Sequence, residues 1–167
     1  MPYSLEQLNQ MSQTEFVEVL GAIFEDTPGI AQAVWNQRPF IDRDQLHQQM
    51  VEVVQALSPD QQLALIRAHP DLGSKAKMAA ASVQEQAGAG LDQLTAAEYD
   101  RFQALNQAYR EKFGFPFIIA VKNHTKTSIL AAFVQRLENS AAQEQQQALS
   151  EIAQIANFRL QDIVESP

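Results

Sequence analysis

Residues 69–73, His-Pro-Asp-Leu-Gly, are followed at residues 82–86 by Ser-Val-Gln-Glu-Gln, so that an imidazole, a hydroxyl, a carboxylate and an amide fall within a short stretch. A histidine exchanges protons near neutral pH, which suits His69 to general acid or base catalysis. Glu85 is a candidate base or a partner for ligand N–H groups, and the amide of Gln86 both donates and accepts hydrogen bonds. This stretch is therefore the strongest candidate for a catalytic site.

The same residues also have a purely structural interpretation. Pro70 disfavours helical dihedral angles at His69, so the imidazole is expected at a helix C-terminus, where the helix dipole favours it. Ser82 and Glu85 fit the capping-box pattern, which predicts a helix that begins at Ser82. Free N–H groups at that start would be able to hold a substrate carboxylate or carbonyl. Spacing alone favours the structural interpretation of His69 and leaves both interpretations of Ser82 and Glu85 open.

Composition narrows the class of protein. A chain of 167 residues suits one domain over residues 1–167, and 46% hydrophobic with 19% charged residues is ordinary for a soluble globular protein. The formal net charge of −8 argues against nucleic acid as a partner, because phosphate binding needs clustered lysine and arginine. No apolar run approaches the roughly 20 residues of a membrane span, and the first residues do not resemble a signal peptide. We therefore expect a cytoplasmic protein that binds neither nucleic acid nor membrane.

Several kinds of reactive site are excluded or unsupported. The chain has no cysteine, which rules out a disulfide framework, a thiolate nucleophile and a cysteine-ligated metal. His47 and His124 show no metal-ligand spacing to each other or to His69, and we interpret both as surface residues. Phosphate-binding glycine loops, nucleophile elbows and His-Glu-x-x-His motifs are also missing from the sequence. We therefore expect no metal and no cofactor.

The elements that must position these residues are predicted to be helices. Helix starts are indicated at four capping residues, namely Ser12, Thr27 before Pro28, Ser58 before Pro59, and Thr95. Gly114 is typical of a helix end, and residues 141–164 fit one amphipathic helix. The apolar stretch 115–121 predicts either a buried extended segment or a buried helix start. The expected fold is an all-α, single compact bundle of about seven to nine helices.

Three separated motifs carry a resemblance to a known family over nearly the whole chain. They are His-Pro-Asp-Leu at 69–72, Ser-x-x-Glu-Gln-Ala-Gly-x-Gly-Leu at 82–91 and Phe-Gly-Phe-Pro-Phe-Ile at 113–118. In type and order they resemble the motifs of the decarboxylases that act on 2-oxo-4-hydroxy-4-carboxy-5-ureidoimidazoline, abbreviated OHCU. The resemblance implies an all-helical and usually dimeric enzyme that needs no metal or organic cofactor. It further implies that a small-molecule ureide, OHCU, loses CO₂ to give (S)-allantoin, the last step of urate conversion.

The resemblance also implies a set of site residues. His69 takes the position of the family's catalytic histidine, and Glu85 is the second catalytic candidate. The substrate-contact positions are Pro70, Ser82, Val83, Gln84, Glu85, Gln86, Phe117, Ile118, Ile119, Ala120 and Val121. The last five lie in the stretch that lines the ring, partly through backbone groups. The connection between the first two motifs looks short for the family, and no role is assigned to Lys75, Lys77 or Lys122.

A mechanism can be formulated as a hypothesis on these residues. His69 would interact with the substrate hydroxyl or carboxylate and help to deliver the proton, while Glu85 would hold the ring or ureido N–H groups. Apolar walls from Phe117 and Ile119 would strengthen both interactions. Two alternatives remain open. A non-catalytic helical interaction module would tolerate loss of His69, and a related helical enzyme for another ureide or hydroxy acid would differ in the lining at 117–121.

Overall fold

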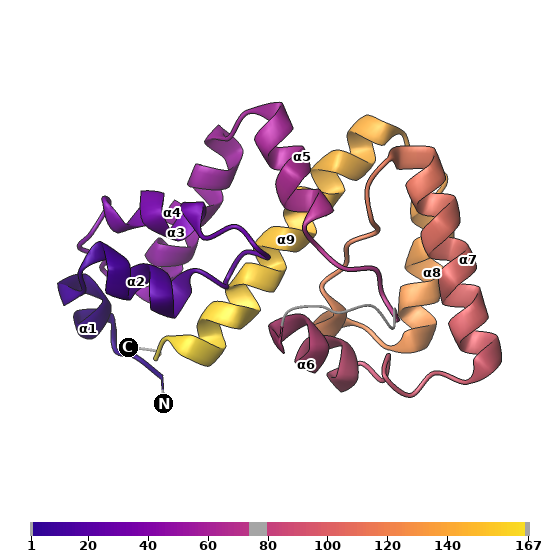
Figure 1. Ribbon diagram of the computed structural model, residues 1–167, viewed down its shortest axis with the longest axis horizontal. Helices are drawn as coiled ribbons and strands as arrows, with labels where there is room; N and C mark the ends of the chain where they lie inside the picture. The colour runs from indigo at the N-terminus through magenta and orange to yellow at the C-terminus, as the bar shows by residue number, and fades with distance from the viewer. Residues whose placement is uncertain (1, 74–79, 166–167) are drawn as a thin grey trace. The chain divides into compact units, whose positions relative to one another are not determined.

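The computed structural model describes residues 2–73 and 80–165, almost entirely as helices and the turns between them (Figure 1). Two units can be distinguished, one formed by residues 1–68 with 153–167 and the other by residues 69–152. Within the described ranges there are nine α-helices, one short 3₁₀ helix and no strand. The predicted all-α fold of about seven to nine helices is therefore confirmed.

The first unit is built from short amphipathic helices. They are α1 (Leu5–Gln10), α2 (Gln13–Leu20), α3 (Gly29–Trp35), α4 (Arg43–Ala56), α5 (Pro59–Arg67) and the last part of α9 (Ala141–Ile163). Helix α3 packs against both α2 and α4. Apolar side chains on these helices, among them Phe16, Val34 and Leu46, are completely buried. Burial of one apolar face, more than helix propensity, stabilises helices as short as these.

Two of the three capping residues predicted in this unit begin helices. The hydroxyl of Ser12 accepts a hydrogen bond from the Glu15 N–H, and Ser58 forms a complete capping box with Gln61 at the start of α5. The prediction for Thr27 is wrong. Helix α3 has Pro28 at its N-cap and no side-chain cap, because the Thr27 hydroxyl donates backwards to the Glu25 carbonyl at 2.7 Å.

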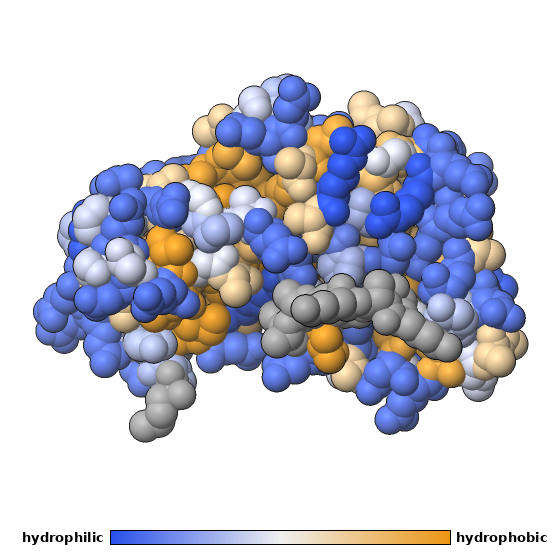
Figure 2. All heavy atoms as spheres, viewed as in Figure 1, coloured by the Kyte–Doolittle hydropathy of each residue, from blue (hydrophilic) through white to orange (hydrophobic). Residues whose placement is uncertain are grey.

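The second unit contains the predicted site motifs. Its elements are α6 (Ala80–Gly88), α7 (Ala96–Phe113), the 3₁₀ helix η1 (Val121–Asn123), α8 (Lys126–Arg136) and the first part of α9. Helix α7 begins with the predicted capping box at Thr95 and ends at Gly114, whose φ of 79° is left-handed as expected for a helix C-terminus. On the face shown in Figure 2 the surface over α7 is mostly hydrophilic, which leaves its other side to the core.

An aromatic core lies beneath α7. The rings of Phe117 and Phe133 stack with centroids 3.7 Å apart, and Tyr109 meets Phe117 edge-on at 5.3 Å. All three side chains are completely buried. The stretch 115–120 is buried and contains no helix, so of the two predicted conformations the buried helix start is wrong for these residues. Pro116 favours this outcome because it disfavours helical dihedral angles at the residue before it.

The pH dependence of stability should include a contribution from Glu98, in the capping box of α7. Its carboxylate accepts the Thr95 N–H at 2.9 Å and pairs with Lys126 at 3.2 Å. The Thr95 N–H, followed by Lys126, lowers the pKa of Glu98 below its ordinary value. The unfolded chain therefore binds more protons in the acid range, and this contribution is lost as the pH falls through the lowered pKa.

We expect Glu98→Gln to weaken the dependence of the melting temperature on pH between neutral and acid conditions, since the amide keeps the cap but cannot titrate. Thermal unfolding of both proteins from pH 7 to about pH 3, which brackets the ordinary carboxyl pKa, measures this difference. Parallel curves for the two proteins would contradict the assignment.

Candidate active site

His69 lies immediately beyond the end of α5, where the sequence predicts that a helix must stop. Helix α5 ends at Arg67 with Ala68 as its C-cap, and the His69 side chain is buried, with 6% of its surface exposed. Pro70 and Asp71 are half-buried, whereas Leu72 and Gly73 are buried. The imidazole is therefore held in a largely dry environment by a short loop, residues 69–73.

Gln86 of α6 connects loop 69–73 to the second motif through two hydrogen bonds. Its Oε1 accepts a hydrogen bond from the Gly73 N–H at 3.0 Å, and its Nε2 donates to the Asp71 carbonyl at 3.4 Å. Gly73 has a φ of 66°, in the left-handed region that a side chain would strain. One buried amide thus fixes the backbone on both sides of Leu72, and with it the direction in which the loop leaves His69.

Helix α7 holds the same loop from another side. Asn106 donates from Nδ2 to the Leu72 carbonyl at 2.9 Å, and Gln103 donates to the Gly73 carbonyl at 3.4 Å. Arg110 pairs with the Asp71 carboxylate at 2.9 Å. Asp71 is therefore engaged with α7 in this structure. The loop owes its shape to polar side chains on two helices rather than to regular secondary structure.

The predicted helix start at Ser82 is wrong. Helix α6 is already helical at Ala80, so Ser82 is not its first residue. The alanines at positions 80 and 81 explain the difference, because alanine has the highest helix propensity and extends the helix ahead of the serine.

Helix α6 nevertheless brings some of the predicted side chains together. Ser82 and Gln86 are buried, at 5% and 7% exposed, and Glu85 is half-buried. Spacings of three and four residues place these three on one face of a helix. Val83, 50% exposed, and Gln84 lie on the exposed face and are not brought together with the others.

The apolar motif lies beside this helix. All five residues from Phe117 to Val121 are buried, none with more than 6% of its surface exposed, and α6 packs against η1, which begins at Val121. The Ile118 carbonyl accepts from Arg136 at 2.6 Å, and the Ala120 N–H donates to Glu151 at 3.3 Å. Between them, the N–H and C=O of Ile119 have no hydrogen-bonding partner among the described residues.

A buried ion pair supports the apolar motif. Arg136 donates from Nε to Glu144 at 2.8 Å, and Glu144 also accepts from the Tyr109 hydroxyl at 2.6 Å and from Asn139 at 2.9 Å. Glu144 is completely buried and Arg136 is 7% exposed. Burial, reinforced by the Glu144 carboxylate, raises the pKa of Tyr109, so its hydroxyl remains a donor. The charges are thus compensated where water does not screen them.

The other two histidines are not the surface residues that the sequence suggested. His47 is half-buried and its Nε2 lies 2.8 Å from the Ala153 carbonyl, while the Nδ1 of His124 lies 3.0 Å from the Ser128 hydroxyl. Both have local structural partners. Lys75 and Lys77 lie outside the described residues, and Lys122 is exposed. In the described ranges no three His, Asp or Glu side chains are grouped so as to hold a metal ion.

The loop-holding residues of α7 were missed by sequence reasoning. Gln103, Asn106 and Arg110 are spaced by three and four residues, a polar stripe on one face of the helix. The stripe would have been the signal, because Asn106 is 2% exposed and buried polar side chains are normally hydrogen-bonded. Arg136 and Glu144 gave no comparable signal, since they pair across the turn between α8 and α9.

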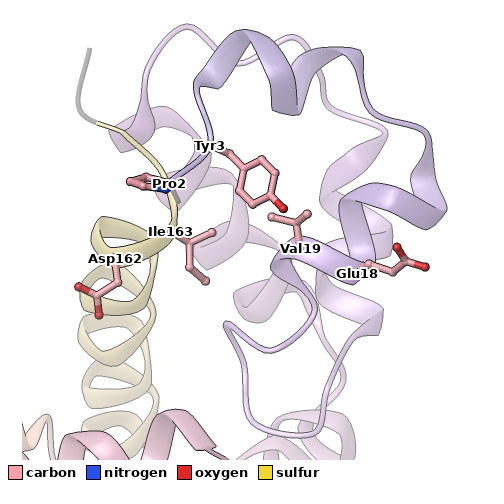
Figure 3. Close-up of a pocket in the computed structure, with 6 residues that line it drawn as sticks. All are labelled: Pro2, Tyr3, Glu18, Val19, Asp162 and Ile163. Carbon is pink, nitrogen blue, oxygen red and sulfur yellow. The ribbon is translucent and has the colours of Figure 1, made fainter.

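Two pockets lined wholly by described residues lie away from the predicted site residues. One of about 740 Å³ in the second unit adjoins Gly73 and is lined by Leu91, Asp92, Leu94, Thr95, Ala96, Tyr99 and Asp100. The other, of about 490 Å³, lies in the first unit beside the bridge between Tyr3 and Val164 (Figure 3). Its two carboxylates, Glu18 and Asp162, point away from each other in Figure 3.

No helix in the described residues is long and apolar enough to span a bilayer.

Comparison with known proteins identifies the family. Residues 9–161 match the profile of the OHCU decarboxylases. The chain is 44% identical over 160 residues to a 2-oxo-4-hydroxy-4-carboxy-5-ureidoimidazoline decarboxylase of Halalkalicoccus jeotgali, covering 96% of this chain and 91% of the relative. It is 45% identical to the uric acid degradation bifunctional protein PucL of Bacillus subtilis, covering 97% of this chain and 33% of that longer protein.

Solved structures agree with this assignment. A crystal structure of (S)-allantoin synthase superposes with a TM-score of 0.79 at 33% identity, over 98% of this chain and 54% of that one. A crystal structure of OHCU decarboxylase in the presence of (S)-allantoin superposes with a TM-score of 0.69 at 20% identity, covering 91% of this chain and 97% of the other, and supports the fold. The match over most of its length shows that this chain belongs to the OHCU decarboxylase family.

Proposed function

We propose that this protein decarboxylates OHCU to (S)-allantoin in urate degradation, as a carboxy-lyase without a metal or organic cofactor. The observation that carries the proposal is the family match over residues 9–161, together with relatives named for this reaction that are similar over nearly their whole length. The polar motifs support it, because loop 69–73 is hydrogen-bonded to the same helix, α6, that carries Glu85 and Gln86.

The chemistry sets the requirements that these residues would have to meet. Loss of CO₂ from C4 leaves an electron pair that the adjacent C5 imine, which is conjugated with the 2-oxo group, can take up. A proton then adds at C5, while the 4-hydroxyl loses its proton and becomes a carbonyl of allantoin. The protein must hold the breaking bond out of the ring plane, so that it overlaps the π system, and then add a proton to one face of the ring. We assign the proton transfer to His69, which would also contact the substrate hydroxyl or carboxylate.

Glu85 and the apolar segment would hold the ring. The Glu85 carboxylate would accept hydrogen bonds from ring or ureido N–H groups and disfavour the departing carboxylate by like charge. Phe117 and Ile119 would exclude water and so strengthen both interactions. The unpartnered N–H and C=O of Ile119 match what a ureide offers, since it carries both N–H donors and carbonyl acceptors.

The remaining predicted contacts fit this arrangement to different degrees. Ser82 and Gln86 share the buried face of α6, and Pro70 follows His69 directly. Val83 and Gln84 are exposed, so any contribution from them would come from the backbone. Ala120 and Val121 would add apolar surface next to Ile118.

The test generates OHCU in place from urate, with urate oxidase and the hydrolase that follows it, and observes optically active allantoin by circular dichroism. A rapid rise of the (S) enantiomer in the presence of the protein is the expected result. OHCU also decays slowly to racemic allantoin without an enzyme, so a signal no faster than that background would refute the proposal.

We further propose that the protein acts as a cytoplasmic homodimer. The dimer rests on the family resemblance, and the absence of cysteine fits a reducing compartment. Size-exclusion chromatography with light scattering would give the mass in solution, and a mass of one chain, 18.6 kDa, would exclude the dimer. Fractionation of cells that express the protein would test the location.

A further inference from the structure

Two charged side chains hold the apolar segment at alternate residues, one on each side of Ile119. Arg136 of α8 donates to the carbonyl of Ile118 at 2.6 Å, and Glu151 of α9 accepts from the N–H of Ala120 at 3.3 Å. We propose that Arg136 and Glu151 are positioning residues, which fix the backbone of Ile119 in the orientation that receives the ureide. This inference rests on the proposed function, because it assigns the ureide to that segment.

The Arg136 guanidinium, which donates to the Ile118 carbonyl, is itself restrained by other contacts. The guanidinium of Arg136 lies 4.3 Å from the centroid of the Phe117 ring, and its Nε is bonded to Glu144. Glu144 in turn accepts a hydrogen bond from the buried Tyr109 hydroxyl at 2.6 Å. A planar guanidinium that stacks and donates in two directions has little rotational freedom left. The position of the Ile118 carbonyl is thereby determined by side chains from α7, α8 and the start of α9.

These contacts restrain the backbone on both sides of Ile119. Its neighbours on both sides have a backbone group committed to a charged side chain, whereas its own N–H and C=O have no partner in the described part of the chain, and only 4% of the residue is exposed. Buried backbone groups are nearly always hydrogen-bonded, so this pair is suited to a ligand that offers both an acceptor and a donor. Fixing the pair would fix the plane of the bound ring, and with it the face that is protonated.

Kinetic measurements can distinguish a positioning role for Arg136 from a role in stability alone. Partial unfolding lowers the amount of active enzyme, which reduces the apparent kcat and leaves KM and the handedness of the product unchanged. A displaced ring-binding backbone raises KM and allows protonation on the wrong face. The enantiomeric excess of the enzymatic allantoin, corrected for the uncatalysed background, therefore reports positioning rather than stability.

Arg136→Lys is the informative variant. Lysine keeps the charge opposite Glu144, but its single ammonium lacks the planar fork that bonds Glu144 and Ile118 together, and it does not stack on Phe117 in the same way. We expect kcat/KM to fall by about 10- to 100-fold, with a raised KM and a lower enantiomeric excess, as for a misplacement near 1 Å. Should this variant not fold, Arg136→Met combined with Glu144→Gln removes both charges together and the same carbonyl contact, with the same expected losses.

Asn139→Ala is the matched control. It removes one hydrogen bond to Glu144 and leaves the contacts of Arg136 with Ile118 and Phe117 in place. We expect it to lower the melting temperature while KM and the enantiomeric excess match those of the original protein. A loss of enantiomeric excess equal to that of Arg136→Lys would overturn the inference, because the effect would then follow stability alone.

Amide hydrogen exchange over residues 117–121 separates this inference from the proposed function. In Arg136→Lys, exchange in this segment should accelerate by at least about 10-fold relative to the original protein, while exchange in α4 is unchanged. If the original protein does not convert OHCU, the proposed function fails, and the exchange result still tests the hold on the backbone. If the original protein is active and the lysine variant matches it in KM, enantiomeric excess and exchange, the positioning role is refuted.

Discussion

Replacing His69 with alanine is expected to lower the rate of (S)-allantoin formation by about 10² to 10⁴-fold, the usual contribution of a general acid or base. The side chain is 6% exposed, at the end of a loop that is hydrogen-bonded to α6 and α7. These loop contacts run through the backbone and side chains of residues 71–73, so the alanine variant should keep its helical circular dichroism. The rate would be measured with OHCU generated in place, at equal concentrations of folded protein.

His47→Gln provides the control for this experiment. His47 is half-buried in the other unit, and its ring contacts the Ala153 carbonyl. A glutamine amide can still donate there, so the variant should retain activity. Glu85→Ala should resemble His69→Ala, since Glu85 is assigned to the ring N–H groups. Near-normal turnover in both the His69 and the Glu85 variants would contradict the proposed mechanism and favour the alternative of a non-catalytic interaction module.

Replacing Glu144 with alanine is expected to have the largest effect on stability, about 3–5 kcal/mol. Glu144 is completely buried and accepts hydrogen bonds from Tyr109, Arg136 and Asn139. Its removal leaves the guanidinium of Arg136, 7% exposed, without a counter-charge, which is costlier than the loss of the attraction itself. Urea unfolding followed by circular dichroism measures the difference in the free energy of unfolding.

The double variant Arg136→Met with Glu144→Leu tests the cause of that loss. Removing both charges leaves no uncompensated ion, and the apolar replacements can pack against Phe117, so the double variant should be more stable than Glu144→Ala. If the single variant loses less than about 1 kcal/mol, Arg136 has a route to solvent or another partner, and the buried-pair account is wrong.

Local signals in the sequence predicted most of the fold. Ser58 and Thr95 start helices and Gly114 ends one because capping depends on a few neighbouring residues. The same reasoning failed at Ser82, where the preceding alanines continue the helix, and at Thr27, whose hydroxyl bonds to the turn before it. In both cases a residue able to cap had a competing local interaction that the pattern did not include.

The sequence could name candidate site residues but not the contacts that support them. His69, Glu85 and Gln86 could be named because their chemistry is unusual beside helix ends and their motifs resemble a family. The Gln86 contact with Gly73 and the Asn106 contact with Leu72 join residues 13 and 34 positions apart, and no local pattern specifies such pairs. The sequence named both Ser82 and Val83, and only the packing of α6 separates them, because it buries Ser82 and leaves Val83 exposed.

The amide of Gln86 has a thermodynamic consequence for ligand binding. Its oxygen takes the Gly73 N–H and its nitrogen gives one hydrogen to the Asp71 carbonyl, which leaves one lone pair and one N–H for a ligand. A ligand that uses these groups orients the amide, and an oriented amide holds the loop more firmly. Because such coupling is reciprocal, occupancy of the site should lower the population in which residues 71–73 are open, and a substitution that favours the open loop should weaken binding.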